Sequence, residues 1–420
     1  MPINAKEREI LRELAKRQAE IAALPVMAER KALWYDLNDG KTEHPLVTME
    51  FHGLEHEVYP AQICEDPLAR AVERQMSHYI FKHENFKDDR VIPASVSVQV
   101  QNSFTSFGAR PDVIRAGKAD GSDSLAYVYK HPVRDLEEDI DVFGKSTFKV
   151  DEGLRITNEL VAQVRDAIGD IIPVRPEFST MSFSPASTLL PYMGMETMFT
   201  SILDYPDLFH RVVRRLTDDY HAYLDAIEAA GAMVLNNDAS RVTQDSYGYT
   251  HDLPGAGYPG RPLKISDLWG YGNSQETVGM SDAMYDEFFF SYAKEISDRY
   301  GLVSYGCCEP VHAIWERCLS RMKNLRKLSV SPWCDQRGLA EMIRGTKICF
   351  HRKPSPNFIS VDSVFDEAAF LNHMKETVRA AAGCPLEITF RDITSVRGEP
   401  QRLTRAVELT REAFATCWKP

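Results

Sequence analysis

The chain has 420 residues, of which 44% are hydrophobic and 26% are charged, which is typical of a globular protein with a large buried core. Its net charge of −12 argues against nucleic acid and anionic membranes as partners, because both need basic surfaces. No long apolar run or signal segment is present, so we expect a cytoplasmic protein without a membrane span. The sequence leaves a monomer and a homodimer both open.

Residues 1–85 are expected to form an N-terminal helical extension. Ala5–Leu24 is rich in strong helix formers and ends before Pro25, which indicates one helix. Asn38–Tyr59 is polar and is interrupted by glycine and proline, which favours an arm outside the main domain. Pro67–His83 has apolar residues at helical spacing and predicts a second helix.

Residues 86–420 alternate between apolar, β-rich runs and helical segments. The predicted strands are Val91–Val100, Ile171–Phe183, Gly231–Leu235, Leu302–Tyr305, Leu325–Val330, Lys347–His351 and Leu386–Phe390. The predicted helices are Asp151–Ile168, Thr188–Tyr220, Ser281–Arg299, Asp366–Ala382 and Thr404–Thr416. This repeat predicts an α/β fold with a parallel sheet, and a barrel is one form of it.

Several of the predicted strands end in polar or sulfur-bearing residues. Cys307, Cys308 and Glu309 follow one strand, His351 ends another, and Asp392 follows the last. In a β/α barrel such ends meet at one face and carry the chemistry. A set of Cys307, Glu309, His351 and Asp392 has the chemistry of a zinc site with an open position. An ordinary buried histidine is an equally good interpretation of His351. Glu309 and Asp392 are also the candidate acid and base.

The long segment Ala239–Gly272 is rich in aromatic residues and glycine, which suits a lid or wall over a flat substrate. A plain surface insertion is the alternative. Arg352, Lys353 and Arg391 add positive charge that could hold a carboxylate or a cofactor phosphate, or could equally pair with Glu309 and Asp392. The predicted substrate-binding residues are Asn237, Asp238, His251, Trp269, Tyr271, Glu276, Trp333 and Arg391.

Three stretches, LVSYGCCEP, NSQETVGMSDAMYDEFFFSYAKEI and EITFRDITSV, resemble the uroporphyrinogen decarboxylase superfamily, most closely its corrinoid-dependent methyltransferase branch. The resemblance implies a (β/α)8 TIM barrel and zinc-assisted transfer of a methyl group to or from the cobalt of a separate corrinoid protein. Cys307 matches the cysteine of the family's His-x-Cys pair. Tyr305 stands in place of that histidine, and Asp392 stands roughly in place of the family's last cysteine.

Three functions remain open from the sequence. The first is a methyltransferase that moves a methyl group from a small donor, such as a methoxylated aromatic or N-methyl compound, to a partner corrinoid protein with zinc assistance. The second is a decarboxylase or lyase of the same fold, with Arg391 or Arg352 on the substrate carboxylate. The third is a non-catalytic protein that sequesters a tetrapyrrole or corrinoid.

Overall fold

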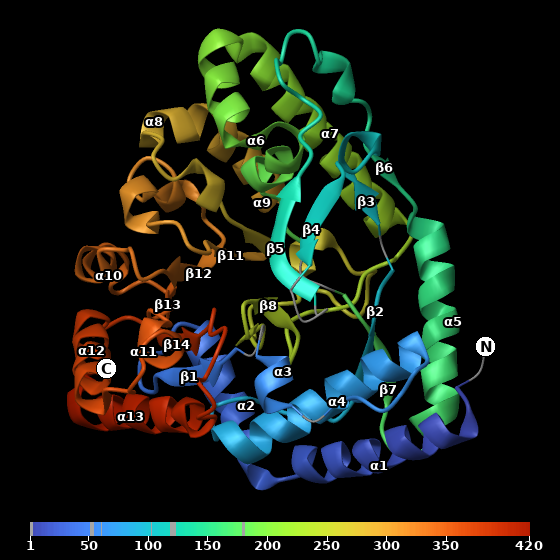
Figure 1. The fold of residues 1–420 in the computed structure, drawn as a ribbon, viewed down its shortest axis with the longest axis vertical. Helices are drawn as coiled ribbons and strands as arrows, with labels where there is room; N and C mark the ends of the chain where they lie inside the picture. The colour runs from blue at the N-terminus through green and yellow to red at the C-terminus, as the bar shows by residue number, and fades with distance from the viewer. Residues whose placement is uncertain (1–2, 51–53, 60, 102, 118–122, 179–180) are drawn as a thin grey trace.

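The computed structural model describes residues 3–50, 54–59, 61–101, 103–117, 123–178 and 181–420 (Figure 1). Its centre is a six-stranded parallel sheet with the order β1-β14-β13-β12-β11-β10. In that order the strands are β1 (Leu46–Met49), β14 (Leu386–Phe390), β13 (Cys349–Arg352), β12 (Leu325–Val330), β11 (Leu302–Tyr305) and β10 (Trp269–Gly272). The prediction of an α/β protein with a parallel sheet is therefore confirmed.

A second parallel pair joins β2 (Val96–Gln99) to β7 (Val174–Glu177). Beyond β7 the chain continues to Ser182, which forms a parallel bridge to Tyr271 of β10. The remaining strands form three short antiparallel pairs: β3 (Phe104–Thr105) with β6 (Thr147–Phe148), β4 (Val113–Gly117) with β5 (Asp123–Tyr129), and β8 (Arg241–Thr243) with β9 (Ser246–Tyr247).

One strand prediction and two predictions of irregular structure need correction. The segment Gly231–Leu235 is described throughout and forms no strand. It is followed by Asn236, whose side chain bonds both the N–H and the carbonyl oxygen of Trp269 and so links the segment to β10 through a side chain. The predicted loop Ala239–Gly272 ends in strand β10, and the predicted arm Asn38–Tyr59 supplies strand β1. Residues 51–53 of that arm, and residues 179–180 of the predicted strand Ile171–Phe183, lie outside the described residues.

The helices agree more closely with the sequence. They are α1 (Ala5–Ala22), α2 (Pro25–Asn38), α3 (Glu55–Val58), α4 (Pro67–Phe86), α5 (Val150–Ile168), α6 (Pro185–Asp204), α7 (Pro206–Ala229), α8 (Asp282–Tyr285), α9 (Ser291–Ser297), α10 (Gln336–Ile343), α11 (Asn357–Ser360), α12 (Glu367–Ala380) and α13 (Gln401–Cys417). The predicted helix Ser281–Arg299 is present as α8 and α9 joined by a π-helical turn, Asp286–Phe290.

Capping explains where the N-terminal helices begin. The Asn4 side chain accepts the Glu7 N–H at the start of α1, and Asp66 accepts the first N–H groups of α4. Proline stands in the first turn of both α2 and α4, where its missing N–H has no cost. Pro25 therefore ends one helix and begins the next.

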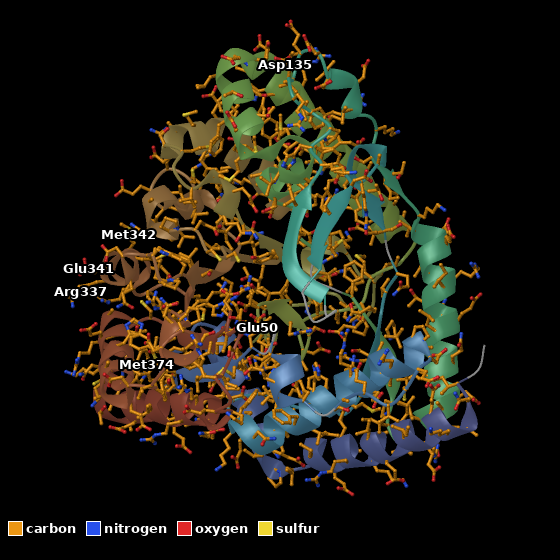
Figure 2. All side chains as sticks on the ribbon, in the orientation of Figure 1. Glu50, Asp135, Arg337, Glu341, Met342 and Met374 are labelled. Atoms are coloured by element: carbon orange, nitrogen blue, oxygen red, sulfur yellow. The ribbon has the colours of Figure 1, made fainter. Side chains whose placement is uncertain are left out.

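The helices surround the sheet and divide the interior into more than one apolar core. Helices α1, α4 and α5 pack on β2 and β7 through their own buried cluster, which includes Leu11, Val72 and Val164 (Figure 1). On the opposite side, α10 turns Arg337, Glu341 and Met342 outward at the rim, whereas Glu50, directly after β1, lies near the centre of the view (Figure 2). The carboxyl ends of β1 and β14 lie together, since Glu50 after β1 pairs with Arg391 after β14.

Among the described residues, no helix is long and apolar enough to cross a membrane. The division at residue 85 remains a prediction, and the parallel sheet takes one strand, β1, from the N-terminal side of it.

Candidate functional site

The carboxyl ends of the parallel strands bring polar side chains from distant parts of the chain together. They are Glu50 after β1, Gln99 at the end of β2, Glu177 at the end of β7, Tyr271 in β10, Cys307 after β11, Lys353 after β13 and Arg391 after β14. Parallel strands place their carboxyl ends at one edge, which is where ligands bind in α/β sheets.

Cys307 lies at the centre of this group. Its Sγ is 3.6 Å from Cys308 Sγ, 3.6 Å from a guanidinium nitrogen of Arg391 and 3.6 Å from Nε2 of Gln244. The Gln244 amide also donates to the Tyr271 hydroxyl at 3.0 Å and accepts from the Lys353 ammonium. One side-chain amide thus joins the thiol, the phenol and the ammonium in a single network.

The charges around Cys307 favour its thiolate. The hydrogen bond from Cys308 lowers the Cys307 pKa, burial opposes it, and Lys353 and Arg391 lower it further, to about 6. Burial lowers the pKa of Lys353 to about 8, against the attraction of Cys307. The same pairing raises the pKa of Cys308, so only one of the two thiols ionises readily.

Glu309 stabilises the backbone of this site, because its carboxylate accepts backbone N–H groups. One carboxylate oxygen accepts the N–H of Ser274 at 2.8 Å and the other accepts the N–H of Cys307 at 2.9 Å. Its side chain is 3% exposed. With both oxygens bonded to backbone, Glu309 fixes the loop that carries Cys307. The Tyr305 hydroxyl bonds Ser274 and Tyr285 and is likewise part of the core.

Arg391 connects Cys307 to two acidic groups. Its Nε lies 3.3 Å from Glu50 and 3.1 Å from Asp392. Burial raises the pKa of Glu50, although the Arg391 charge opposes this. The carboxylate of Asp392 is 53% exposed and pairs with Arg391, so its place in the structure is at the edge of the cluster.

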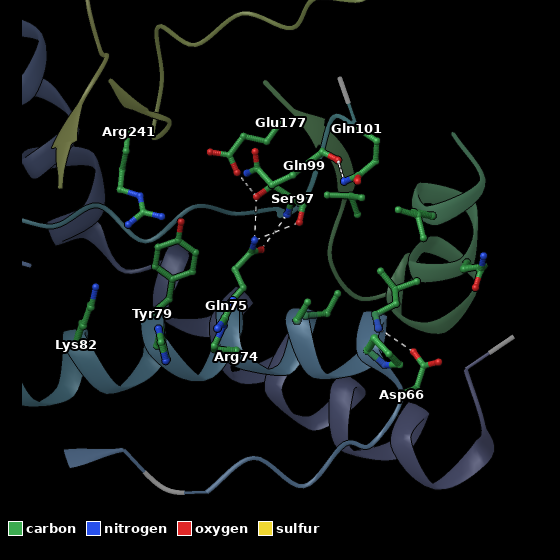
Figure 3. A pocket seen from close by; sticks show the side chains of 18 of the residues that line it. Asp66, Arg74, Gln75, Tyr79, Lys82, Ser97, Gln99, Gln101, Glu177 and Arg241 are labelled. Carbon is green, nitrogen blue, oxygen red and sulfur yellow. Dashed lines mark hydrogen bonds between the residues drawn. The ribbon is translucent and has the colours of Figure 1, made fainter. Parts of the chain in front are cut away.

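Two adjoining cavities open beside these residues. The smaller, of about 280 Å³, is lined by Gln244 and Tyr271. The larger, of about 720 Å³, lies between α4, β2 and the β8 segment (Figure 3). Both include Gln99, Glu177 and Arg241 in their linings. Together they have the size of a site for a small organic molecule, with the Cys307 network at one end.

The predicted zinc ligands are not brought together. In the described part of the chain, no group of three or more His, Cys, Asp or Glu side chains is placed to hold a metal ion. His351 is fully buried inside the sheet, where its Nε2 lies 2.8 Å from the Thr389 hydroxyl and 3.6 Å from Glu387. Burial, with the charges of Lys353 and Lys327, holds the His351 pKa well below its usual value. The ordinary buried histidine is the interpretation that fits.

Several predicted substrate-binding residues have structural partners instead. Trp269 is fully buried and its indole N–H donates to the Gly248 carbonyl. The amide of Asn237 donates to the Leu253 carbonyl, and Asp238 pairs with Arg175. These three side chains follow or lie in segments that fold differently from the prediction.

The other predicted residues divide between surface and site. His251 is 73% exposed and binds Asp39, which directly follows α2, and Trp333 is 68% exposed on the outer surface. Glu276 accepts the Ser187 hydroxyl at 2.7 Å. Tyr271 joins the Cys307 network through Gln244, and Arg391 contacts Cys307 directly.

Two parts of this region were not predicted from the sequence. They are Gln244 and the cations Lys82, Arg90 and Arg241 in the lining of the larger cavity. Gln244 sits in a segment without periodicity, so nothing in the pattern marks it. In the sequence, Lys353 stands out only as a positive charge directly after a predicted strand. That position is the signal by which it could be assigned to the site.

No family model matches the sequence, and no curated protein matches it. Among solved structures, a methyltransferase from Methanosarcina mazei is similar in fold, with a TM-score of 0.51 and 14% sequence identity. The match covers 92% of this chain and 99% of that chain. At this identity the likeness concerns the fold alone.

Proposed function

We propose that the chain is a methyltransferase that moves a methyl group from a small-molecule donor to the cobalt of a corrinoid carried by a partner protein. The observation that carries the proposal is the Cys307 network, in which Gln244 joins the Cys307 thiol, the Tyr271 hydroxyl and the Lys353 ammonium at the end of the smaller cavity. The fold likeness to an archaeal methyltransferase is consistent with it.

The chemistry needs a group that stabilises the leaving heteroatom. When the methyl–heteroatom bond breaks, its electron pair stays on the heteroatom, which then needs a proton or a positive charge. A reduced corrinoid supplies the nucleophile when it is bound. Lys353 holds the proton for the leaving atom, and the Gln244 amide orients Lys353. The described residues do not form the predicted zinc site, so no step is assigned to zinc.

We also infer that the parallel strands close into the (β/α)8 barrel that the family resemblance implies. The bridge from Ser182 to Tyr271 and the bond from the Asp89 N–H to the Val47 carbonyl support this closure. A corrinoid protein would then dock over the carboxyl ends of the strands.

The direct test is methyl transfer to chemically reduced cob(I)alamin, followed by the absorbance of methylcobalamin, with methoxylated aromatic and N-methyl donors. We expect Lys353→Met to lower the rate about 100-fold, the usual contribution of a positioned acid. Arg337→Gln on the exposed face of α10 is the matched control and keeps the wild-type rate. A Lys353→Met rate equal to the wild-type rate would overturn the proposed role of this site.

One observation favours the alternative decarboxylase. The larger cavity contains cations that suit a carboxylated substrate. Arg352, in contrast, is buried and donates to the carbonyls of Val330 and Ser331, and Arg391 is already paired. Release of CO2 from a carboxylated donor without any corrinoid would favour the decarboxylase. Methyl transfer without CO2 release would favour the methyltransferase.

A further inference from the structure

Strands β8 and β9 are joined by a tight turn that lies largely inside the protein. Thr243 pairs with Ser246 across the two strands, so Gln244 and Asp245 form the turn between them. Asp245 is 1% exposed and Ser246 is fully buried. Turns commonly lie at the surface, where water bonds their polar groups. The polar side chains of a buried turn need partners inside the protein instead.

Two residues of this turn are anchored by buried cations. The Asp245 carboxylate accepts from the Arg90 guanidinium at 2.9 Å, and Arg90 also donates to the carbonyl of Met49 in β1 at 2.7 Å. The Ser246 hydroxyl accepts from the ammonium of Lys327 in β12 at 2.6 Å. The turn is therefore tied to two strands of the parallel sheet, β1 through Arg90 and β12 through Lys327.

The backbone of Asp245 is in the left-handed region, with a φ of 44°. This region is unfavourable for most L residues, although aspartate and asparagine tolerate it better than the others. A residue in this conformation persists when its surroundings hold it there, and such residues cluster at functional sites. Here the bonds of Asp245 and of Ser246 hold the turn.

Gln244 precedes Asp245 and belongs to the Cys307 network. Its amide oxygen accepts from the Lys353 ammonium, and its amide nitrogen lies 3.0 Å from the Tyr271 hydroxyl and 3.6 Å from Cys307 Sγ. One amide can bond three groups only if its backbone is held at the right distance from all three. The conformation of the turn therefore decides whether this part of the network forms.

We propose that Asp245 is a positioning residue for the proposed reaction: its carboxylate, bonded to Arg90, fixes the turn that sets the Gln244 amide against Lys353. Asp245 lines the larger cavity, whereas Gln244 lines the smaller one beside the Cys307 network, so Asp245 acts through Gln244. The inference rests on the proposed function for its effect on the rate, whereas the positioning is a property of the turn itself.

A double-mutant cycle on methyl transfer to cob(I)alamin tests whether the two residues act as one unit. We expect Gln244→Ala to lower the rate about 10-fold, part of the roughly 100-fold that loss of a positioned acid costs. Asp245→Ala should lower the rate by a similar factor. The double variant should again be about 10-fold slower than wild type, because each change removes the same contact.

Two further variants separate positioning from stability. Asp245→Asn keeps an oxygen for Arg90 and a side chain that tolerates the left-handed region, so it should retain more of the rate than Asp245→Ala. Glu73→Gln is the matched control, because Glu73 is a buried carboxylate whose bonds to the N–H groups of Ile63 and Cys64 hold a different loop. It should keep the wild-type rate even if urea unfolding shows a loss of stability.

A second measurement follows the same network without methyl transfer. Iodoacetamide alkylates the Cys307 thiolate, and peptide mass spectrometry gives the rate at that residue. We expect Gln244→Ala and Asp245→Ala each to slow alkylation about 3- to 10-fold, because an N–H group that favours the thiolate is lost or displaced. The double variant should be no slower than Gln244→Ala, and Glu73→Gln should react as wild type does.

Three results would overturn the inference: effects that multiply in the double variant, an Asp245→Ala variant that behaves as wild type, or an equal loss of rate in Glu73→Gln. If Asp245→Ala does not fold, Asp245→Asn takes its place in the cycle. A wild-type protein without methyl transfer would overturn the proposed function alone, since the alkylation cycle still decides whether Asp245 positions Gln244.

Discussion

This molecule contains two buried ionic clusters, and they differ in how far their charged side chains are exposed to solvent. In the sheet, Lys327 of β12 binds Glu387 of β14 at 2.9 Å, and both side chains are completely buried. Ser246 accepts from Lys327 and donates to Glu387. We call this pair with Ser246 the core cluster. One cation meets one carboxylate there, and the third member is neutral.

The cavity cluster consists of Lys82, Arg90, Arg241, Asp245 and Asp88. Arg90, Arg241 and Lys82 all lie within 3.5 Å of Asp245, and the Arg241 side chain is 61% exposed. A closed interior cannot keep an unpaired charge, because the cost of removing it from water is too large. A cavity wall can, since solvent or a ligand reaches it. The difference teaches that a completely buried ion pair serves the fold alone, whereas the cavity cluster keeps one of its cations in contact with solvent.

The largest effect is expected in the core cluster. Glu387→Gln leaves the Lys327 ammonium fully buried without a carboxylate, which should lower the free energy of unfolding by about 3–5 kcal/mol. Urea unfolding followed by circular dichroism measures it. The double variant Lys327→Met, Glu387→Leu should recover much of the loss, because it buries no charge. A loss below about 1 kcal/mol for Glu387→Gln would contradict a closed pair.

A smaller effect is expected for Asp245→Asn in the cavity cluster. Arg90 keeps Asp88, and Lys82 and Arg241 keep access to the cavity, so we expect a loss of about 1–3 kcal/mol in the free energy of unfolding. Urea unfolding at neutral pH compares it with Glu387→Gln. If Asp245→Asn costs more than Glu387→Gln, the distinction between the two clusters is wrong.

The same variant has a predictable pH dependence. Burial raises the Asp245 pKa, but Arg90, Lys82 and Arg241 outweigh it and hold the pKa far below its usual value. A carboxyl group whose pKa is lowered in the folded state stabilises the protein at any pH above its unfolded-state pKa. This stabilisation is lost progressively as the pH falls below about 4. The stability difference between wild type and Asp245→Asn should therefore shrink in acid. Parallel curves between pH 7 and 3 would argue against this.

The smallest effect on stability is expected for Arg241→Gln. The side chain is 61% exposed and Asp245 keeps two other cations, so the free energy of unfolding should change by less than about 0.5 kcal/mol. Thermal unfolding of Arg241→Gln measures the change, with Arg405→Gln, at an exposed ion pair on α13, as the control. A loss above about 1 kcal/mol would mean that Arg241 is needed for the fold, and the distinction between the two clusters would then be wrong.

Much of the fold could be predicted because apolar runs carry their own signal. The prediction of Leu386–Phe390 matches β14 at both ends, and Ala5–Leu24 contains α1. The predictions failed where local composition and tertiary contacts disagree. Strand β1 lies in a polar, interrupted segment, and it is ordered by pairing with β14 and by the Asp89 carboxylate on the Val47 N–H.

The site was predictable only in part, for a related reason. Cys307, Tyr271 and Arg391 lie in or directly after strands, so their meeting at one edge follows from the parallel sheet. Lys82 and Arg241 are 159 positions apart in number, and each resembles an ordinary surface charge in the sequence. Only the packing of α4 against the β8 segment makes them neighbours of Asp245.

His351 provides the last test of the comparison, because the sequence placed it among zinc ligands and the structure places it beside the core cluster. Its ring contacts Thr389 and lies 3.6 Å from Glu387. We expect elemental analysis to give the same zinc content per chain for wild type and His351→Asn, whatever that content is, while the free energy of unfolding falls. Loss of zinc in the folded His351→Asn variant, with zinc present in wild type, would return His351 to the metal site. It would also show that complete burial of an ion pair is not a sufficient mark of a structural cluster.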